Sequence, residues 1–350
     1  MVHPTSQPAQ WRKIVAEPYH SGGRNRRGKP SLIYRMHLRR EPRERVAMHE
    51  FFTAEVDTGE TTIFVRGHGS GPPLLLLHGF PQTHLMWRSV APLLAARYSV
   101  VCADLRGYGR SGCPASGPDH AAYAKRAMAR DMIAVMDRLG FSQFAVCGHD
   151  RGGRVAYRLA LDHPERVARL AVMDILPIET AWQHADARFA LGYWPWSLLA
   201  QPEPLPERIL SLNAETIIDH ALAEWGSATT AFPAEVRAAY TAALSEPNHA
   251  HAVCEEYRAA ATIDREHDKA DGDSGRRLRC PVLVLWSARG PLDSWYVAAG
   301  GPLALWRAWG EEIEGRPLEG GHFFPETSPA ATAAALEGFL RAAGKENRPH

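Results

Sequence analysis

Short apolar runs alternate with helix-like segments along most of this chain, and this alternation constrains the fold more than any other feature. Leu74–Leu77, Val100–Ala103 and Phe144–Cys147 are continuous apolar runs of strand length, as expected for strands that are buried on both faces of a sheet. Amphipathic segments such as Tyr123–Leu139 separate them. Strands that alternate with helices predict an α/β fold with a mostly parallel, doubly wound sheet.

The same pattern predicts further elements and divides the chain into parts. The other expected elements are a hairpin of Phe51–Val56 and Thr61–Arg66, helices over Met86–Tyr98, Gly153–His163 and Pro329–Ala342, and strands over Leu170–Met173 and Val282–Trp286. Residues 48–176 and 276–343 are therefore predicted to form the α/β core, and residues 344–350 a tail. Residues 177–275 are rich in Trp and Pro and have helical patterning. We expect them to form a helical cap over the carboxyl ends of the strands, where ligands bind in open α/β sheets.

Charge is distributed unevenly along the chain. Residues 1–47 hold eleven Lys or Arg and three acidic residues and lack sustained apolar periodicity, which predicts a disordered basic extension. The formal net charge is +1, and no apolar run approaches the roughly 18–20 residues that span a bilayer. We therefore expect neither a nucleic acid nor a membrane as a partner. Five widely spaced cysteines without a C-x-x-C motif indicate neither a disulfide framework nor a zinc site and favour the reducing cytoplasm.

The segment Phe144–Arg154 carries the sharpest chemical signal. It predicts a strand, a tight turn and a helix, and Gly148-His-Asp-Arg-Gly152 has the spacing of a nucleophile elbow with Asp150 in the place usually held by serine. Flanking glycines permit the cramped turn, and a helix N-terminus favours an ionised carboxylate, so Asp150 is the predicted nucleophile. The alternative is that Asp150 only caps the helix, and three further elements in the expected order argue against it.

The first of these elements is His78-Gly-Phe-Pro81, directly after the predicted strand Leu74–Leu77. In a nucleophile-elbow fold, the turn after this strand supplies one backbone N–H to an oxyanion hole, here that of Phe80. The residue after the nucleophile, Arg151, supplies the other.

The remaining two elements are a histidine and an acid. His322 lies late in the chain in a glycine-rich setting and is the predicted general base. Asp174 directly follows the predicted strand Leu170–Met173 and is expected to orient His322. Asp293, after Val282–Trp286, is the rival for that role. We prefer Asp174 because it lies closer to the end of its strand.

These motifs are part of a wider similarity over residues 49–342, which resemble the fluoroacetate/haloacetate dehalogenases of the α/β-hydrolase superfamily. The stretches that carry the resemblance include His-Gly-Phe-Pro-Gln-Thr-His (78–84), Gly-His-Asp-Arg-Gly-Gly-Arg (148–154), Asp-Ile-Leu-Pro (174–177), Leu-Ala-Gln-Pro (199–202), Cys-Glu-Glu-Tyr-Arg (254–258) and Gly-His-Phe (321–323). The resemblance implies an α/β-hydrolase fold and an Asp150–His322–Asp174 triad that removes halogen from a small 2-halocarboxylic acid. Family members are often dimers, so a homodimer is among the expected assemblies.

Two arginines beside the nucleophile fit an anionic substrate. The guanidinium groups of Arg151 and Arg154 supply planar donors suited to a carboxylate and offset its repulsion from Asp150, whereas a neutral alkyl halide or epoxide would not need them. The resemblance assigns the two arginines the same role, and we expect His149 to contact the substrate as well. Ion pairing at the surface on the first helical turn is the alternative.

The expected reaction has two steps. Asp150 displaces halide in line and becomes an ester, and His322 then activates water, while the N–H groups of Phe80 and Arg151 hold the oxyanion. The product is a 2-hydroxy acid, and neither a metal nor an organic cofactor is required.

Gly107–Gly112 matches G-x-G-x-x-G, but a loop follows it where a dinucleotide site needs a helix, so we interpret it as a structural turn.

The resemblance also implies a halide pocket made of a His-Trp pair and a Tyr. Trp196 and Tyr257 match the Trp and the Tyr, but Pro195 stands at the His position, and proline has no side-chain donor. Trp194 is the candidate to compensate, and core packing is the alternative role for Trp196. Because fluoride is small, strongly hydrated and most dependent on donors, we predict cleavage of chloro- or bromoacetate rather than of fluoroacetate.

Two other functions are compatible with parts of this pattern. An epoxide hydrolase would share the nucleophile and base and would need cap tyrosines, for which Tyr193, Tyr240 and Tyr257 are candidates. The arginine pair argues against it. A catalytically silent scaffold that binds a small acid is the other alternative, and the intact Asp–His–Asp set argues against that.

Overall fold

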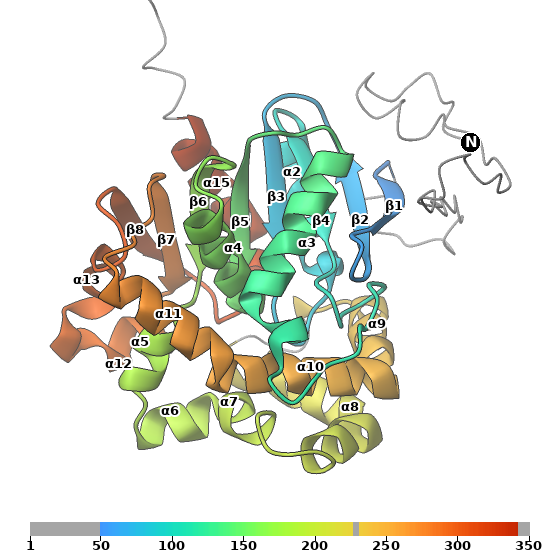
Figure 1. Cartoon of the computed structure of the whole chain (residues 1–350). Helices are drawn as coiled ribbons and strands as arrows, with labels where there is room; N and C mark the ends of the chain where they lie inside the picture. The colour runs from blue at the N-terminus through green and yellow to red at the C-terminus, as the bar shows by residue number, and fades with distance from the viewer. Residues whose placement is uncertain (1–49, 227–230, 342–350) are drawn as a thin grey trace, which may run out of the picture.

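The computed structural model describes residues 50–226 and 231–341, and its centre is one β-sheet (Figure 1). In chain order the strands of these residues are β1 (Phe52–Asp57), β2 (Thr62–His68), β3 (Pro73–Leu77), β4 (Ser99–Ala103), β5 (Phe144–His149), β6 (Val167–Met173), β7 (Val282–Ser287) and β8 (Ile313–Leu318). They lie in the order β1-β2-β4-β3-β5-β6-β7-β8. The pairs β1–β2 and β2–β4 are antiparallel, and every pair from β4 to β8 is parallel. The predicted mostly parallel α/β fold is confirmed.

Helices cover both faces of the sheet, because successive side chains of a strand point to opposite faces. In β3, Leu75 and Leu77 enter one apolar core, and Leu74 and Leu76 enter the other. The first core packs against α3 (Lys125–Arg138), α4 (Asp150–Asp162) and α13 (Gly301–Arg307), and the second against α2 (Ala91–Ala95) and α15 (Pro329–Arg341). Burial on both faces is the reason why the central strands are continuous apolar runs.

Between β6 and β7 the chain leaves the sheet and forms a run of helices that lies across one end of it (Figure 1). These insertion helices are α5 (Ile178–Gln183), α6 (Ala187–Gly192), α7 (Trp194–Leu198), α8 (Leu205–Glu224), α9 (Ala234–Ser245), α10 (Pro247–Ala261) and α11 (Ile263–Asp273). No strand occurs in the described residues of this stretch, in agreement with its helical patterning.

Two local predictions differ from the structure. The helix predicted over Met86–Tyr98 is split into η2 (His84–Trp87) and α2, because Pro92 lacks the N–H that a continuous helix needs and instead lies in the first turn of a new one. Strand β8 was not predicted. It lies at the edge of the sheet, most of its side chains are exposed or half-buried, and it contains Pro317, so it lacks the apolar run that marks a central strand.

The predictions for residues 1–47 and 344–350 fall outside the described residues. Across the described ranges, none of the helices is both long enough and apolar enough to cross a membrane. The same ranges contain no cluster of three His, Cys, Asp or Glu side chains arranged to hold a metal ion.

The shorter helices are η3 (Ala121–Tyr123), α12 (Pro291–Trp295), η5 (Val297–Ala299) and α14 (Phe324–Thr327).

Candidate active site

The turn between β5 and α4 holds Asp150 in a strained backbone conformation. Its φ is +44°, a left-handed value that residues other than glycine adopt only where the surrounding structure enforces it. α4 begins at Asp150 itself, earlier than the predicted start at Gly153. The turn is so tightly packed that a Cβ on Gly152 would lie 2.3 Å from the carbonyl oxygen of His78. The strand, sharp turn and helix predicted for this segment are therefore present.

One backbone amide and one guanidinium hold the Asp150 carboxylate. The Phe80 N–H donates to Oδ1 at 2.9 Å, and Nη1 of Arg154 donates to Oδ2 at 3.1 Å. Gly79 allows this approach, because a Cβ there would lie 2.4 Å from the Cβ of Asp150. Burial by itself would raise the pKa of Asp150, but the charges of Arg154 and His322 outweigh burial and hold the pKa well below its usual value. Asp150 is therefore ionised at neutral pH, as a nucleophilic carboxylate must be.

His322 and Asp174 form a hydrogen-bonded pair from distant segments. Nδ1 of His322 lies 2.6 Å from Oδ2 of Asp174. Asp174 follows β6 with a φ of +52°, and its Oδ1 accepts the N–H of Ser287 at 2.9 Å. The rival acid, Asp293, instead accepts the indole N–H of Trp286 at 2.9 Å. The geometry thus pairs His322 with Asp174 and not with Asp293.

A small cavity brings these groups together. Its volume is about 20 Å³, which is room for one or two water molecules. Its lining combines Asp150, Arg154, Asp174 and His322 of the core with Tyr193, Pro195, Trp196, Trp225 and Tyr257 of the insertion. A wider pocket of about 600 Å³ borders the cavity and shares the side chains of Asp174, Tyr193, Trp225 and His322 with it. The predicted nucleophile, base and acid therefore meet in one enclosed space at the carboxyl ends of β5 and β6, beneath the insertion.

Arg151 lies behind this cavity and is fixed by a buried acid. Its Nε and Nη2 donate to Glu256 of α10 at 2.7 Å each, and Lys125 also contacts this carboxylate. Its guanidinium carbon lies 4.0 Å from the ring centre of Tyr257. Arg151 is not one of the described residues that line the cavity, and its buried Nη1 has no hydrogen-bond partner among them. Arg151 therefore places a positive charge behind Tyr257, which lines the cavity.

Arg154, in contrast, lines the cavity directly. Its Nη1 is engaged by Asp150, and its guanidinium carbon lies 4.6 Å from the ring centre of Trp196, a distance typical of a cation–π contact. Its Nε is buried and has no partner within the described part of the chain. A buried donor of this kind costs about 1–3 kcal/mol when it is left unpaired, so an acceptor brought by a ligand would be stabilising here.

Besides Arg151, two further predicted contacts are not brought to the cavity and need correction. Neither His149 nor Trp194 is among the described residues that line it. Nε2 of His149 lies 2.8 Å from the carbonyl oxygen of His322, and burial lowers the pKa of His149 to about 3, so the ring is a neutral donor that holds the base loop. The ring centre of Trp194 lies 6.0 Å from that of His220, and its buried Nε1 has no hydrogen-bond partner among the described residues.

Trp225 is a site residue that the sequence did not reveal. It directly follows α8, its ring lies edge-on to that of His322 with the ring centres 5.5 Å apart, and its carbonyl accepts the N–H of His322 at 2.7 Å. The contact is so close that a Cβ on Gly321 would lie 2.3 Å from the carbonyl group of Gly226. The insertion thus contacts the loop that carries His322 through the Trp225 ring and through backbone atoms, and the backbone contacts leave no side-chain signature in a sequence.

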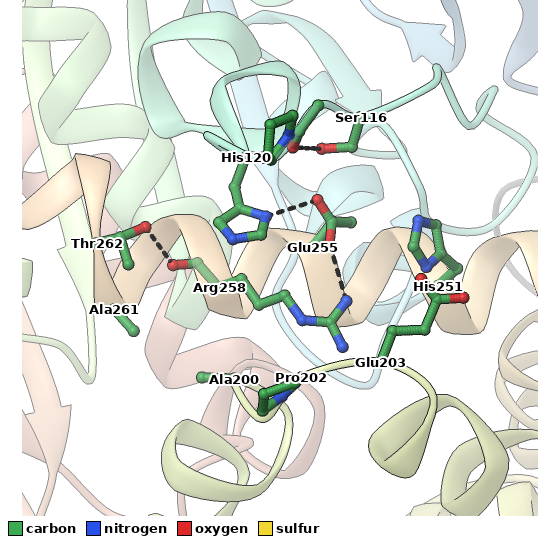
Figure 2. Close-up of a pocket in the computed structure, with 12 residues that line it drawn as sticks. Ser116, His120, Ala200, Pro202, Glu203, His251, Glu255, Arg258, Ala261 and Thr262 are labelled. Atoms are coloured by element: carbon green, nitrogen blue, oxygen red, sulfur yellow. Dashed lines mark hydrogen bonds and ion pairs between the residues drawn. The ribbon is translucent and has the colours of Figure 1, made fainter.

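Another pocket, of about 510 Å³, lies along α10 and is lined by none of Asp150, Asp174 and His322 (Figure 2). There His120 and Arg258 both point toward Glu255 (Figure 2). Nδ1 of His120 lies 2.9 Å from Oε2 of Glu255, and Nη1 of Arg258 donates to Oε1 at 2.8 Å. Arg258 also donates to the carbonyl oxygen of Gln201 at 2.7 Å. These polar side chains pair with one another, whereas the cavity at Asp150 holds an unpaired donor, so the chemistry points to the cavity.

Comparison with known proteins agrees with this fold. The α/β hydrolase fold family matches residues 72–329. The chain is 44% identical over 286 residues to a fluoroacetate dehalogenase from Burkholderia sp., a match that covers 81% of this chain and 92% of the relative. The chain therefore belongs to the α/β hydrolase fold family, and within it to a haloacetate dehalogenase-like group.

Other relatives widen the range of chemistry. A soluble epoxide hydrolase from Corynebacterium sp. is 31% identical over 274 residues, which cover 75% of this chain and 87% of the relative. The crystal structure of an α/β hydrolase from Nostoc sp. PCC 7120 has a TM-score of 0.79 at 46% identity and covers 84% of this chain and 99% of its own. The relatives thus include both a dehalogenase and an epoxide hydrolase. The choice between these two activities therefore depends on the residues of the site.

Proposed function

We propose that this enzyme hydrolyses a small 2-halocarboxylic acid to the 2-hydroxy acid through an ester on Asp150. The observation that carries the proposal is an ionised carboxylate beside an unpaired guanidinium donor. Arg154 lines the cavity with Nε unpaired among the described residues, and Arg151 adds a second positive charge from behind Tyr257. A substrate carboxylate would pair with Arg154, and the two charges would offset its repulsion from Asp150.

In the first step a carboxylate oxygen of Asp150 attacks the carbon that bears the halogen. Both oxygens accept a hydrogen bond, Oδ1 from the Phe80 N–H and Oδ2 from Nη1 of Arg154. We assign the attack to Oδ2, because the backbone amide beside Oδ1 is the proposed oxyanion donor of the second step. The new C–O bond forms as the carbon–halogen bond breaks, and the electron pair of that bond leaves with the halide. Arg154 would hold the substrate carboxylate so that the attack is in line, and a chiral carbon would be inverted.

In the second step His322 removes a proton from water. Its Nδ1 is paired with Asp174, so Nε2 is the proposed base, and Asp174 would stabilise the imidazolium that forms. The water oxygen attacks the ester carbonyl, and Oδ1 becomes the oxyanion beside the N–H groups of Phe80 and Arg151. As this intermediate collapses, the bond between its central carbon and the substrate oxygen breaks, and the His322 imidazolium gives its proton to that oxygen, which leaves as the hydroxyl group of the 2-hydroxy acid. Asp150 is regenerated as a carboxylate once its new carboxyl group loses its proton to solvent. Every group in the two steps is a side chain, a backbone amide or water.

The size of the cavity supports a short acid. The cavity is about 20 Å³ and has Trp196, Trp225 and Tyr257 among its lining residues, so these side chains must move to admit even chloroacetate, and a longer chain would require a larger movement. Pro195 also lines the cavity and has no side-chain donor for fluoride. We therefore propose chloroacetate and bromoacetate as better substrates than fluoroacetate.

An epoxide hydrolase is the second candidate, and one observation favours it. Tyr193 and Tyr257 both line the cavity, where two hydroxyl groups could protonate an opening epoxide. Tyr240, also considered from the sequence, instead donates to Glu326 at 3.0 Å. The unpaired donor of Arg154 favours an acid over a neutral epoxide. The hydrogen-bonded His322 favours catalysis over a silent scaffold.

Halide release from fluoro-, chloro- and bromoacetate, measured beside diol formation from styrene oxide, tests the proposal. We expect chloride and bromide release without diol. In a His322→Ala variant, incubation with chloroacetate should increase the mass of the peptide that contains Asp150 by one carboxymethyl group, and the double variant with Asp150→Asn is the matched control. Diol without halide would support the epoxide hydrolase, and no adduct with any acid would support the silent scaffold.

A further inference from the structure

Tyr193 brings an unpaired hydroxyl group to the catalytic cavity. The residue lines the cavity together with Asp150 and His322. Its hydroxyl oxygen is buried and has no hydrogen-bond partner within residues 50–226 and 231–341. A buried hydroxyl left unsatisfied costs about 1–3 kcal/mol. A cost of that size next to the nucleophile indicates an acceptor that arrives with the substrate.

The packing around Tyr193 keeps this hydroxyl in place as a donor. Its ring centre lies 5.4 Å from that of Phe189, edge to face, and 5.1 Å from that of Trp295. Its backbone N–H donates to the carbonyl oxygen of Phe189 at 2.8 Å. Burial, together with the charge of Asp174, raises the pKa of Tyr193 well above its usual value, so the hydroxyl keeps its proton. The ring has contacts on two sides that oppose its turning away to another partner.

The other insertion side chains of the cavity differ from Tyr193 in the donors that they carry. Pro195 has no side-chain donor. The rings of Trp196 and Tyr257 lie against guanidinium groups, with the Trp196 ring centre 4.6 Å from the guanidinium carbon of Arg154 and the Tyr257 ring centre 4.0 Å from that of Arg151. Trp225 also lines the cavity, but its indole N–H donates to the carbonyl oxygen of Gly192 at 3.2 Å. Among the insertion residues that line the cavity, Tyr193 is the one with a fully buried donor that has no partner in the described part of the chain.

In-line displacement fixes where a leaving atom must go. Asp150 belongs to the core and Tyr193 to the insertion, so an attack from Asp150 pushes the leaving atom toward the insertion. Arg154 is the proposed partner of the substrate carboxylate, which leaves the Tyr193 hydroxyl for the other end of the substrate.

We propose that the Tyr193 hydroxyl donates a hydrogen bond to the halide as it leaves, and so supplies the donor that Pro195 cannot. This inference rests on the proposed dehalogenase function. The electron pair of the carbon–halogen bond goes to the halide, the proton stays on the tyrosine oxygen, and the hydrogen bond strengthens as negative charge develops on the halogen.

The test is a Tyr193→Phe variant with a series of leaving groups. Loss of one donor aimed at developing charge costs about 100-fold in rate or more, and the loss should follow the need of the halide for hydrogen bonds. We expect single-turnover ester formation to fall about 100-fold for fluoroacetate, about 10-fold for chloroacetate and less than about 3-fold for bromoacetate. If wild-type turnover of fluoroacetate is too slow to measure, the ratio of chloroacetate to bromoacetate decides.

The control is Tyr98→Phe, because Tyr98 is also buried but packs in the core on the opposite face of the sheet. It should leave all three rates unchanged, and melting curves should show that both variants fold. Equal losses for the three acids in Tyr193→Phe, or no loss, would overturn the inference while the wild-type activity stands. Absence of halide release from wild-type enzyme with every acid would instead overturn the proposed function, and this inference with it.

Discussion

Glu256 of α10 holds the guanidinium of Arg151 by two nitrogens, Nε and Nη2, at 2.7 Å each. Both side chains are fully buried, and Lys125 contacts the same carboxylate. The insertion therefore fixes a positive charge of the core directly behind the cavity. This buried pair links the packing of the insertion to the electrostatics of the proposed site.

A Glu256→Gln substitution should weaken substrate binding through Arg151. It leaves two buried cations without their shared carboxylate, which should lower the free energy of unfolding by about 3 kcal/mol. We expect the KM for chloroacetate to rise about 10-fold, which corresponds to about 1.4 kcal/mol, with a smaller change in kcat. Steady-state kinetics and urea unfolding measure the two effects. Glu255→Gln, one position earlier and in the pocket of Figure 2, is the control, and an equal rise in KM there would contradict the role of Glu256.

Replacing Arg154 should affect binding more strongly, because Arg154 lines the cavity. Hydrogen bonds to charged groups contribute about 1.5–3 kcal/mol, so Arg154→Leu should raise the KM for chloroacetate about 10- to 100-fold. Arg154→Lys should restore part of the loss, since it keeps the charge but not the planar donors. Arg126, half-buried and paired with Asp162, supplies the control Arg126→Leu. An unchanged KM in Arg154→Leu would exclude the carboxylate contact.

Gly79→Ala should displace the nucleophile. The added Cβ would lie 2.4 Å from the Cβ and 2.7 Å from Oδ1 of Asp150, so the carboxylate must shift. A displacement of about 1 Å costs about 100-fold in rate, which measurement of halide release would detect. Gly338→Ala is the matched control, because the same change meets nothing within 4 Å there and should stabilise α15 by up to about 1 kcal/mol. Full activity in Gly79→Ala would refute the close approach.

The buried His149 should make the fold sensitive to acid. Burial, with the charge of His322 adding to it, lowers the pKa of His149 to about 3, whereas histidine in an unfolded chain titrates near pH 6.5. Between these values the unfolded chain binds a proton that the folded chain does not. This histidine therefore lowers the free energy of unfolding by about 1.4 kcal/mol for each unit that the pH falls below about 6.5.

His149→Gln should remove that pH-dependent loss. Urea unfolding at pH 7, 6 and 5 should show a shallower decline for this variant than for the wild type, although its stability at pH 7 is lower. His184→Gln is the control because His184 is exposed, and it should keep the wild-type slope. Parallel slopes for His149→Gln and wild type would show that His149 takes up its proton in the folded state.

The sequence predicted those parts of the proposed site that depend on residues close together in the chain. The glycines that flank Asp150 predicted the strained turn at this residue. The Phe80 amide, which contacts the Asp150 carboxylate, follows an apolar run that predicted a strand. Side-chain periodicity and glycine spacing are local properties, and they predicted the central strands for the same reason. The edge strand β8 was missed because exposure removes the apolar run on which the prediction depends.

The sequence by itself determined the α/β order of elements and the candidate nucleophile, base and acid. Only the tertiary structure decided that Asp174, rather than Asp293, meets His322 and that Tyr193, rather than its neighbour Trp194, lines the cavity. Tyr193 lies in the turn between α6 and α7, and Trp194 is the first residue of α7, so the packing of the insertion selects which side chain faces the nucleophile. That packing joins segments far apart in the chain, and no local pattern of residues encodes the distance between them.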